Sequence, residues 1–332
     1  MAVRGPARKS SLKISNAVRI YSTTSARKWE ASRHYIRADA EPNWSQRVKE
    51  KEGDVVQIAS KPAIAITMTS TVIDAVELMY EKRVRGLVVV SSNNTLKGTL
   101  MATDIVNYLG GGATYRLVEQ RHKRDIFSAL RSESVESLMN PTPLYATVRS
   151  KVTDVLRVMV LNGVGLVPIV DDKGSPVGVV TEHDLVRHLV SNNIGIKVSN
   201  IMTSNIVAAY ETDSIKRAAQ LMSLYGFRRV PVLSKDSDSI VGILSALDFI
   251  SFFGSHEALK RLTSYDIEDV LSTPVSELMT EEVYTVNEDA DIGEAAQLMN
   301  KFNTNSLLVV DKGGEVKGIV TERDILVSLA IR

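Results

Sequence analysis

One seven-residue pattern occurs four times in this chain, at residues 98–104, 178–184, 242–248 and 318–324. Each copy begins with a glycine and ends with an aspartate, and three copies have a hydroxyl residue midway between them. The aspartates are Asp104, Asp184, Asp248 and Asp324, and the hydroxyl residues are Thr181, Ser245 and Thr321. Such a repeat constrains the architecture strongly, because each copy belongs to one supersecondary unit that packs against the others.

The sequence around each copy is repeated as well. An apolar stretch with helical spacing ends in a methionine, and a run typical of a β-strand follows it. A polar turn and a second short apolar run then lead into the seven-residue pattern. We therefore predict an α/β (α+β) fold of four units, numbered 1 to 4 along the chain, each with the order strand, helix, strand, strand, helix.

A longer period groups these units in pairs, because Asp104 and Asp248 are 144 positions apart and Asp184 and Asp324 are 140 apart. We predict a basic extension over residues 1–54, a first pair over 55–192 and a second pair over 196–332. The repeats are expected at about 55–111, 135–190, 198–254 and 275–330. The linkers inside the pairs, residues 110–134 and 254–273, have the mixed composition of amphipathic helices.

Composition excludes several classes of protein. No apolar run approaches the ~18 residues that cross a bilayer, so we expect no membrane span and a cytoplasmic protein. The chain has no cysteine, and its five histidines lack the spacing of a zinc site. No nucleophile or acid–base pair is evident, so we expect no enzyme, no catalytic residue and no metal.

The N-terminal region has a strong charge bias. Residues 1–37 contain nine Lys or Arg and one acid, Glu30. Such a segment can dock on the repeats, bind nucleic acid as a basic arm, or act as a targeting peptide. Trp29, Tyr35 and Trp44 favour docking of part of it, since aromatic side chains in an extension usually pack against a surface.

The repeated pattern has two chemical interpretations. A hydroxyl followed three residues later by an acid at a helix start is close to a capping box, which satisfies free backbone amides. The same arrangement suits a nucleotide, because helix N-termini favour phosphate and a carboxylate can accept both hydroxyls of a ribose. Unit 1 keeps Asp104 although its hydroxyl position is Met101, which favours a role for the acid itself.

Basic residues near the second strand support the nucleotide interpretation. Unit 3 has Arg228 and Arg229 there, unit 1 has Arg85, and the corresponding positions of units 2 and 4 are uncharged. Guanidinium groups complement phosphate through forked hydrogen bonds. Alone, these arginines would be read equally well as solvated surface charges.

These features together resemble the cystathionine β-synthase (CBS) domain family over about residues 55–332. The resemblance rests on the element order, the Gly-x-x-Thr/Ser-x-x-Asp pattern, the apolar helix ending in methionine and the Val-Pro-Ile/Val strands. It implies repeats paired into two modules, in a disc similar to that of the gamma regulatory subunit of AMP-activated protein kinase. It also implies AMP, ADP, ATP or S-adenosylmethionine as a regulatory ligand.

The resemblance assigns roles to particular residues. Asp104, Asp184, Asp248 and Asp324 correspond to the ribose-binding acid, and Thr181, Ser245 and Thr321 to its hydroxyl. Arg228, Arg229 and Arg85 correspond to the phosphate-binding pair, and we expect unit 4 to lend Thr321, Arg323 and Asp324 to the opposite cleft. Units 3 and 4 are expected to bind best.

Two functions follow from the sequence. The first is a ligand sensor that binds a nucleotide and signals its occupancy to an unidentified regulated protein, as a monomer or a homodimer. The alternative is an interaction scaffold whose basic arm, residues 1–37, binds nucleic acid.

Overall fold

Each unit of the computed structural model has the predicted order of elements. The structure describes residues 12–15, 19–21, 51–190, 193–237 and 239–331. Units 1 and 2 consist of β2 (Ala65–Thr67), α2 (Val72–Lys82), β3 (Gly86–Val90), β4 (Leu96–Met101) and α3 (Ala102–Leu109), and of β5 (Ala146–Thr147), α6 (Val152–Asn162), β6 (Leu166–Val170), β7 (Pro176–Thr181) and α7 (Glu182–Leu189).

Units 3 and 4 repeat this order, with a divided first strand in unit 3. They consist of β8 (Asn205–Val207), β9 (Ala209–Tyr210), α8 (Ile215–Tyr225), β10 (Arg229–Leu233), β11 (Ile240–Ser245) and α9 (Ala246–Gly254), and of β12 (Thr285–Asn287), α11 (Ile292–Lys301), β13 (Ser306–Val310), β14 (Val316–Thr321) and α12 (Glu322–Ile331). In every unit the first strand runs parallel to the second, and the third pairs antiparallel with it.

The glycine of the repeated pattern lies where the chain of another unit crosses the sheet. A Cβ atom on Gly98 would lie 2.7 Å from the carbonyl oxygen of Asn140, which precedes unit 2. A Cβ on Gly178 would lie 2.9 Å from the carbonyl of Ser60, which precedes unit 1. Only glycine allows backbones to approach so closely.

The same exchange joins units 3 and 4. A Cβ on Gly242 would lie 2.9 Å from the carbonyl of Thr280, and one on Gly318 would lie 2.6 Å from that of Thr203. Backbone hydrogen bonds run in both directions at each of the four crossings. The crossings therefore unite units 1 and 2 in one module and units 3 and 4 in another.

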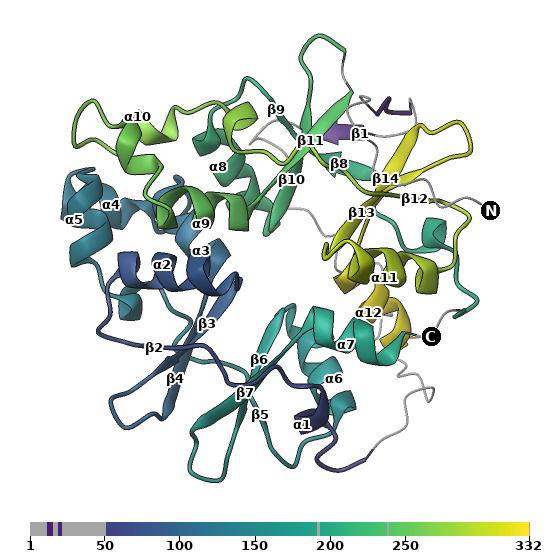
Figure 1. Cartoon of the computed structure of the whole chain (residues 1–332), viewed down its shortest axis with the longest axis horizontal. Helices are drawn as coiled ribbons and strands as arrows, with labels where there is room; N and C mark the ends of the chain where they lie inside the picture. Colours follow the sequence, from purple (N-terminus) through teal and green to yellow (C-terminus); the bar gives the residue numbers. More distant parts are fainter. Residues whose placement is uncertain (1–11, 16–18, 22–50, 191–192, 238, 332) are drawn as a thin grey trace.

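Helices join the two modules. One hydrophobic core contains the helices of units 1 and 3, and a second contains those of units 2 and 4. Figure 1 shows the four units around a common centre, with the helices of units 1 and 3 on the left and those of units 2 and 4 on the right. The fold is the predicted one, four repeats paired in two modules in a disc-like arrangement.

The linkers inside the modules contain helices, as expected. Residues 110–134 include α4 (Tyr115–His122) and α5 (Ile126–Ser132). Residues 254–273 include a 3₁₀ turn, Ala258–Arg261, and α10 (Glu268–Leu271). Among the described residues, none of the helices has the length and apolarity that crossing a bilayer requires.

Part of the basic N-terminal segment docks on the second module. Strand β1 (Arg19–Tyr21) pairs parallel with β8, while Leu12 bridges to Ile240 and Ile14 bridges to Val316. The docking alternative is therefore confirmed for residues 12–15 and 19–21. Residues 1–11, 16–18 and 22–37 lie outside the described residues, so nucleic-acid binding by this arm stays a prediction.

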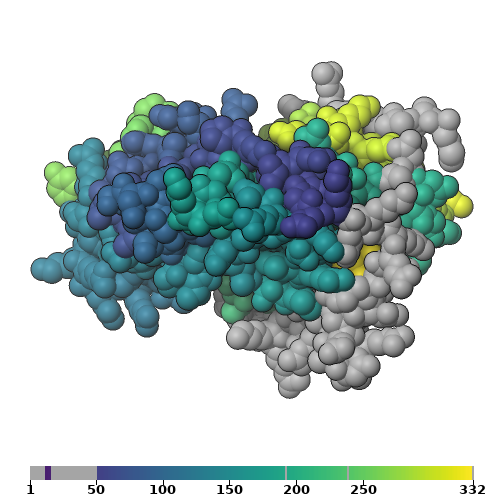
Figure 2. All heavy atoms as spheres, turned by 90° about the horizontal axis from the view of Figure 1, so that it is seen from below, coloured from purple at the N-terminus to yellow at the C-terminus, as the bar shows by residue number. Residues whose placement is uncertain are grey.

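The chain then reaches the first module through α1 (Val55–Ile58), which packs beside unit 2. The carboxylate of Asp54 accepts a hydrogen bond of 2.7 Å from the backbone N–H of Val152. In Figure 2, these dark residues lie against the teal surface of unit 2. The segment that leads into unit 1 is thus held by its partner unit.

We predict that the core shared by units 1 and 3 is essential for stability. Phe253 of α9 is 1% exposed and contacts Phe249 at 5.0 Å between ring centroids. Phe253→Ala should lower the free energy of unfolding by about 3–5 kcal/mol, because it leaves a cavity at this interface. Chemical denaturation measures the loss. Leu161→Ala, at a side chain that is 52% exposed, is the control and should change stability by less than about 0.5 kcal/mol; equal losses would contradict the prediction.

Candidate functional site

The repeated pattern caps the second helix of the unit. In units 2, 3 and 4, one carboxylate oxygen of the aspartate accepts from both the backbone N–H and the hydroxyl of the preceding Thr or Ser. These distances lie between 2.6 and 2.8 Å at Asp184, Asp248 and Asp324. In unit 1, Asp104 accepts only from the backbone N–H of Met101, at 2.7 Å. The capping interaction is therefore present in all four units.

Capping uses only one oxygen of each carboxylate. The second oxygen, Oδ1, accepts no hydrogen bond from the described residues in Asp104, Asp248 or Asp324. In Asp184 it accepts from the hydroxyl of Ser60 at 3.2 Å. Three of the four acids thus keep an acceptor available while their other oxygen fixes the side chain in place.

Burial makes these acids unusual. It raises the pKa of Asp104 and Asp324 to about 6, and it also raises the pKa of Asp248. The cause is desolvation, which the hydrogen bonds from the capping residues only partly offset. Hydrogen-bond donors at the free Oδ1 atoms, such as a diol, would favour the ionised form.

Four arginines gather where the units meet, and we call them the central arginines: Arg85, Arg228, Arg229 and Arg323. Arg85 and Arg228 occupy equivalent positions, because the carbonyl of each accepts from the first N–H of the second helix of its unit. Arg229 begins β10, and Arg323 lies in the first turn of α12. The sequence predicted all four as binding residues, and the structure places them in one cluster of interacting charges.

Two buried glutamates complete this cluster, and the sequence interpretation missed both. Glu182 is 4% exposed and Glu322 is 2% exposed. They are the first helical residues of α7 and α12, directly after Thr181 and Thr321. The repeated pattern contained a signal for these glutamates, because units 1 and 3 have alanine at the same position.

Glu182 binds two of the central arginines. Its Oε1 accepts from Arg323 Nε at 2.7 Å, and its Oε2 accepts from Arg228 Nη1. Although burial opposes ionisation, the two guanidiniums lower the pKa of Glu182, so the carboxylate stays charged. The interaction joins unit 2 to units 3 and 4.

The other two central arginines have no carboxylate partner among the described residues. Arg229 donates to the hydroxyl of Ser306 at 2.5 Å, and no hydrogen bond or ion pair engages Arg85. Desolvation lowers the pKa of Arg229 to about 9 and also lowers that of Arg85. Two desolvated cations near each other favour an anion between or beside them.

The second glutamate has a different partner. Glu322 Oε1 lies 2.6 Å from Nδ1 of His183, which is 30% exposed. The contacts Glu182–Arg323 and Glu322–His183 relate units 2 and 4 reciprocally, because both pairs use the first two residues of the helix. The two contacts differ in chemistry, since one partner is a guanidinium and the other is an imidazole.

A glycine gives Arg228 its position. A Cβ atom on Gly165 would lie 2.2 Å from Arg228 Nη2, so the guanidinium of unit 3 fills the space that a side chain of unit 2 would occupy. Gly165 is the position in unit 2 that corresponds to Arg85 and Arg228. Arg228 therefore supplies unit 2 with the guanidinium that its own sequence lacks.

Only some of the predicted site residues lie close to the central arginines. Asp248 lies close enough to Arg229 for the arginine to lower its pKa against the larger effect of burial, and Ser245 pairs with Arg229 across the strands. Asp324 and Thr321 lie beside Arg323 and Glu182. No hydrogen bond or ion pair links Asp104 to a central arginine. Thr181 donates to Asp184, which also accepts from Ser60.

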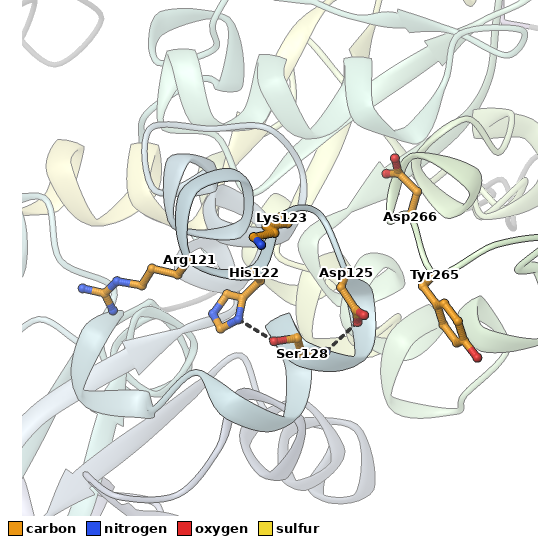
Figure 3. A pocket seen from close by; sticks show the side chains of 7 residues that line it. All are labelled: Arg121, His122, Lys123, Asp125, Ser128, Tyr265 and Asp266. Atoms are coloured by element: carbon orange, nitrogen blue, oxygen red, sulfur yellow. Dashed lines mark hydrogen bonds between the residues drawn. The ribbon is translucent and has the colours of Figure 1, made fainter.

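A separate polar pocket lies at the outer rim, between the linkers of units 1 and 3. Arg121, His122, Lys123, Asp125, Ser128, Tyr265 and Asp266 line it. Figure 3 shows His122, Ser128 and Asp125 joined by hydrogen bonds, the first of which is 2.8 Å long. None of the residues of the repeated pattern lines this pocket, so the central cluster is the stronger candidate. Nowhere in the described parts of the chain do three or more His, Asp or Glu side chains form a group that could hold a metal ion.

Comparison with known proteins agrees with the four-repeat fold. The CBS domain family model matches residues 54–111, 135–191, 198–255 and 275–331. An uncharacterized 33.4 kDa protein in the ribosomal RNA operon of Thermofilum pendens is 34% identical over 268 residues, covering 81% of this chain and 88% of the relative.

Two solved structures have a similar fold over most of the chain. The crystal structure of protein MJ1225 of Methanocaldococcus jannaschii, described as a candidate archaeal homologue of g-AMPK, has a TM-score of 0.76 and 29% identity. The match covers 83% of this chain and 99% of that one. A conserved protein of Pyrococcus horikoshii, 19% identical with a TM-score of 0.53, covers 84% and 100% and shows the fold alone.

We predict a pH-dependent effect of Asp324→Asn on the ligand-free protein. The pKa of Asp324 is about 6 when folded and ordinarily 3.8, so its stabilising contribution is complete below pH ~4 and is lost as the pH rises through ~6. Asparagine mimics the protonated acid at every pH. The variant should be more stable than wild type by about 1–3 kcal/mol at pH 7.5, with the difference disappearing toward pH 4. Denaturation at several pH values measures it, and a difference independent of pH would contradict the prediction.

We also predict energetic coupling between Gly165 and Arg228. Gly165→Ala should lower the free energy of unfolding by about 1–3 kcal/mol, because the new methyl group displaces the Arg228 guanidinium. In an Arg228→Ala background the same change should cost less than about 0.5 kcal/mol, since the obstacle is gone. A double-mutant cycle measures this coupling. An equal cost in both backgrounds would show that the glycine is needed for another reason.

Proposed function

Because the chain belongs to the CBS domain family, we propose that it is a non-catalytic regulatory protein that binds an adenine nucleotide where its units meet. One observation supports this most directly. Arg85 and Arg229 are desolvated guanidiniums without a carboxylate partner among the described residues, and Arg229 lies near both Arg85 and the acid of unit 3. A phosphoryl group is the anion that such a pair of guanidiniums favours.

Asp248 and Ser245 suit the sugar of the same ligand. The capping hydrogen bonds hold the carboxylate of Asp248 at 2.7 Å from the N–H and hydroxyl of Ser245, and its Oδ1 keeps its acceptor capacity. A ribose supplies two neighbouring hydroxyl donors to such an oxygen. We assign the sugar to Asp248 and the phosphate to Arg229 and Arg85.

The arginines favour AMP, ADP or ATP over S-adenosylmethionine, which has no phosphate. The likeness to MJ1225, a candidate homologue of the kinase gamma subunit, supports adenine as the base. Asp324, Thr321 and Arg323 form a second candidate cleft, and Asp184, Thr181 and Asp104 form weaker ones. The modules over 55–192 and 196–332 are the bodies whose relative arrangement we expect the ligand to change.

Signalling would follow from the position of the site. Arg85 belongs to the first module and Arg229 to the second, so a phosphate that contacts both favours one arrangement of the modules over others. A regulated partner protein would recognise that arrangement, in a monomer or a homodimer of this chain. The nucleotide thereby acts as an effector and undergoes no reaction.

We predict that Arg229→Ala selectively weakens binding of phosphorylated ligands. The dissociation constant for AMP should rise at least about tenfold, the value expected when a charge-assisted hydrogen bond is lost. Affinity for adenosine should change less than about twofold, because adenosine has no phosphate. Asp248→Ala should weaken both ligands, since both contain the ribose. Isothermal titration calorimetry measures all three proteins.

Arg149→Ala provides the matched control. Arg149 is 68% exposed and pairs with Asp172 on the outer hairpin of unit 2, so its loss should leave AMP affinity unchanged. The proposed function would be rejected if wild-type protein gave no binding heat with AMP, ADP, ATP or S-adenosylmethionine. It would also be rejected if Arg229→Ala and Arg149→Ala bound AMP equally well.

A further inference from the structure

The central arginines are in two different states. Arg85 and Arg229 have no carboxylate partner among the described residues, whereas Arg228 and Arg323 share the carboxylate of Glu182. We propose that Glu182 is a specificity-determining resident anion that blocks phosphate at Arg228 and Arg323 and directs it to Arg85 and Arg229. The inference rests on the proposed function, because it concerns which arginines receive the ligand phosphate.

The geometry of Glu182 is that of a bound anion. Each of its two oxygens accepts from a different guanidinium, and the side chain is almost fully buried between units 2, 3 and 4. Carboxylate and phosphate oxygens compete for the same donors of a guanidinium. A phosphoryl group approaching these donors would also meet the negative charge of Glu182, so the two anions exclude each other.

Arg323 keeps a donor that the carboxylate does not use. Its Nη2 is buried without a hydrogen-bond partner among the described residues. Both oxygens of the Glu182 carboxylate already accept a hydrogen bond from a guanidinium. A phosphoryl group has a third terminal oxygen, which could accept from this unused donor once the carboxylate no longer competes.

Glu322 does not block the other arginines in the same way. Its hydrogen-bonded oxygen is directed to His183 at 2.6 Å, and it contacts neither Arg85 nor Arg229 within salt-bridge distance. Its charge still favours the protonated form of both arginines from farther away. The asymmetry between the two glutamates therefore creates one blocked pair and one open pair of guanidiniums.

Removing the charge of Glu182 tests this proposal. Glu182→Gln keeps the size and an acceptor oxygen but removes the competing anion. AMP should bind about tenfold more tightly or at an additional site, since two charge-assisted contacts become available. Pyrophosphate should gain affinity to a similar degree, while adenosine should stay within about twofold of wild type. Isothermal titration calorimetry gives both the affinity and the number of sites.

Glu277→Gln is the matched control. Glu277 forms an exposed pair with Arg261, with both side chains about 40% exposed, so removing its charge should not change any of these affinities. Unchanged or weaker binding of AMP and pyrophosphate to Glu182→Gln would overturn the inference. Weaker binding would mean that Glu182 orients Arg228 and Arg323 for the ligand.

A thermal melt covers the case in which Glu182→Gln unfolds easily. Pyrophosphate that binds the native state should then raise its melting temperature more than that of wild type or Glu277→Gln. An equal shift in the three proteins would also overturn the inference. The two proposals can fail separately. If wild type binds no nucleotide but pyrophosphate still binds Glu182→Gln more tightly than wild type, only the proposed function is contradicted.

Discussion

The backbone crossing at the four repeated glycines is the contact on which the remaining structure depends. At Gly98, Gly178, Gly242 and Gly318, the segment leading into one unit lies on the sheet of its partner, at a distance that no Cβ atom permits. These reciprocal contacts fix two units in each module and leave their helices facing outward from the sheets. The helices of the two modules then bury one another in two shared cores, which brings all four units to one centre.

The units differ in the charged residues that they contribute to that centre. Units 1 and 3 contribute the arginines next to their second strands, and units 2 and 4 contribute Glu182 and Glu322 at their helix starts. Each helix start lies beside the second strand of its own unit. At the centre these positions face those of the other units, so Glu182 of unit 2 meets Arg228 of unit 3 and Arg323 of unit 4. Four similar units thereby contribute four different sets of charged residues to the centre, a result that duplication alone would not give.

The sequence predicted the fold well because its evidence is local and repeated. Element order, helical linkers and the capping role of Thr181, Ser245 and Thr321 all depend on residues a few positions apart. The reason for each glycine was not predictable, since the crossing segment comes from another unit. For the same reason, adjacent Arg228 and Arg229 read as one phosphate-binding pair, whereas the structure turns Arg228 toward Gly165 and Glu182 and Arg229 toward Ser306. In the sequence Glu182 resembles an ordinary first-turn acid, because its partners Arg228 and Arg323 are distant along the chain.

Capping and ligand binding are compatible in the repeated aspartate because a carboxylate has two oxygens. At Asp248, one oxygen is fixed by the N–H and hydroxyl of Ser245, which immobilises the side chain, while the other keeps its acceptor capacity. An acid that is already immobilised loses little conformational entropy when a ligand binds. Burial makes its charge costly until donors arrive, so in the proposed complex part of the binding free energy comes from relieving that cost. In the function that we propose, the same local motif that starts the helix also holds the sugar, and phosphate contacts from two modules connect binding to their relative arrangement.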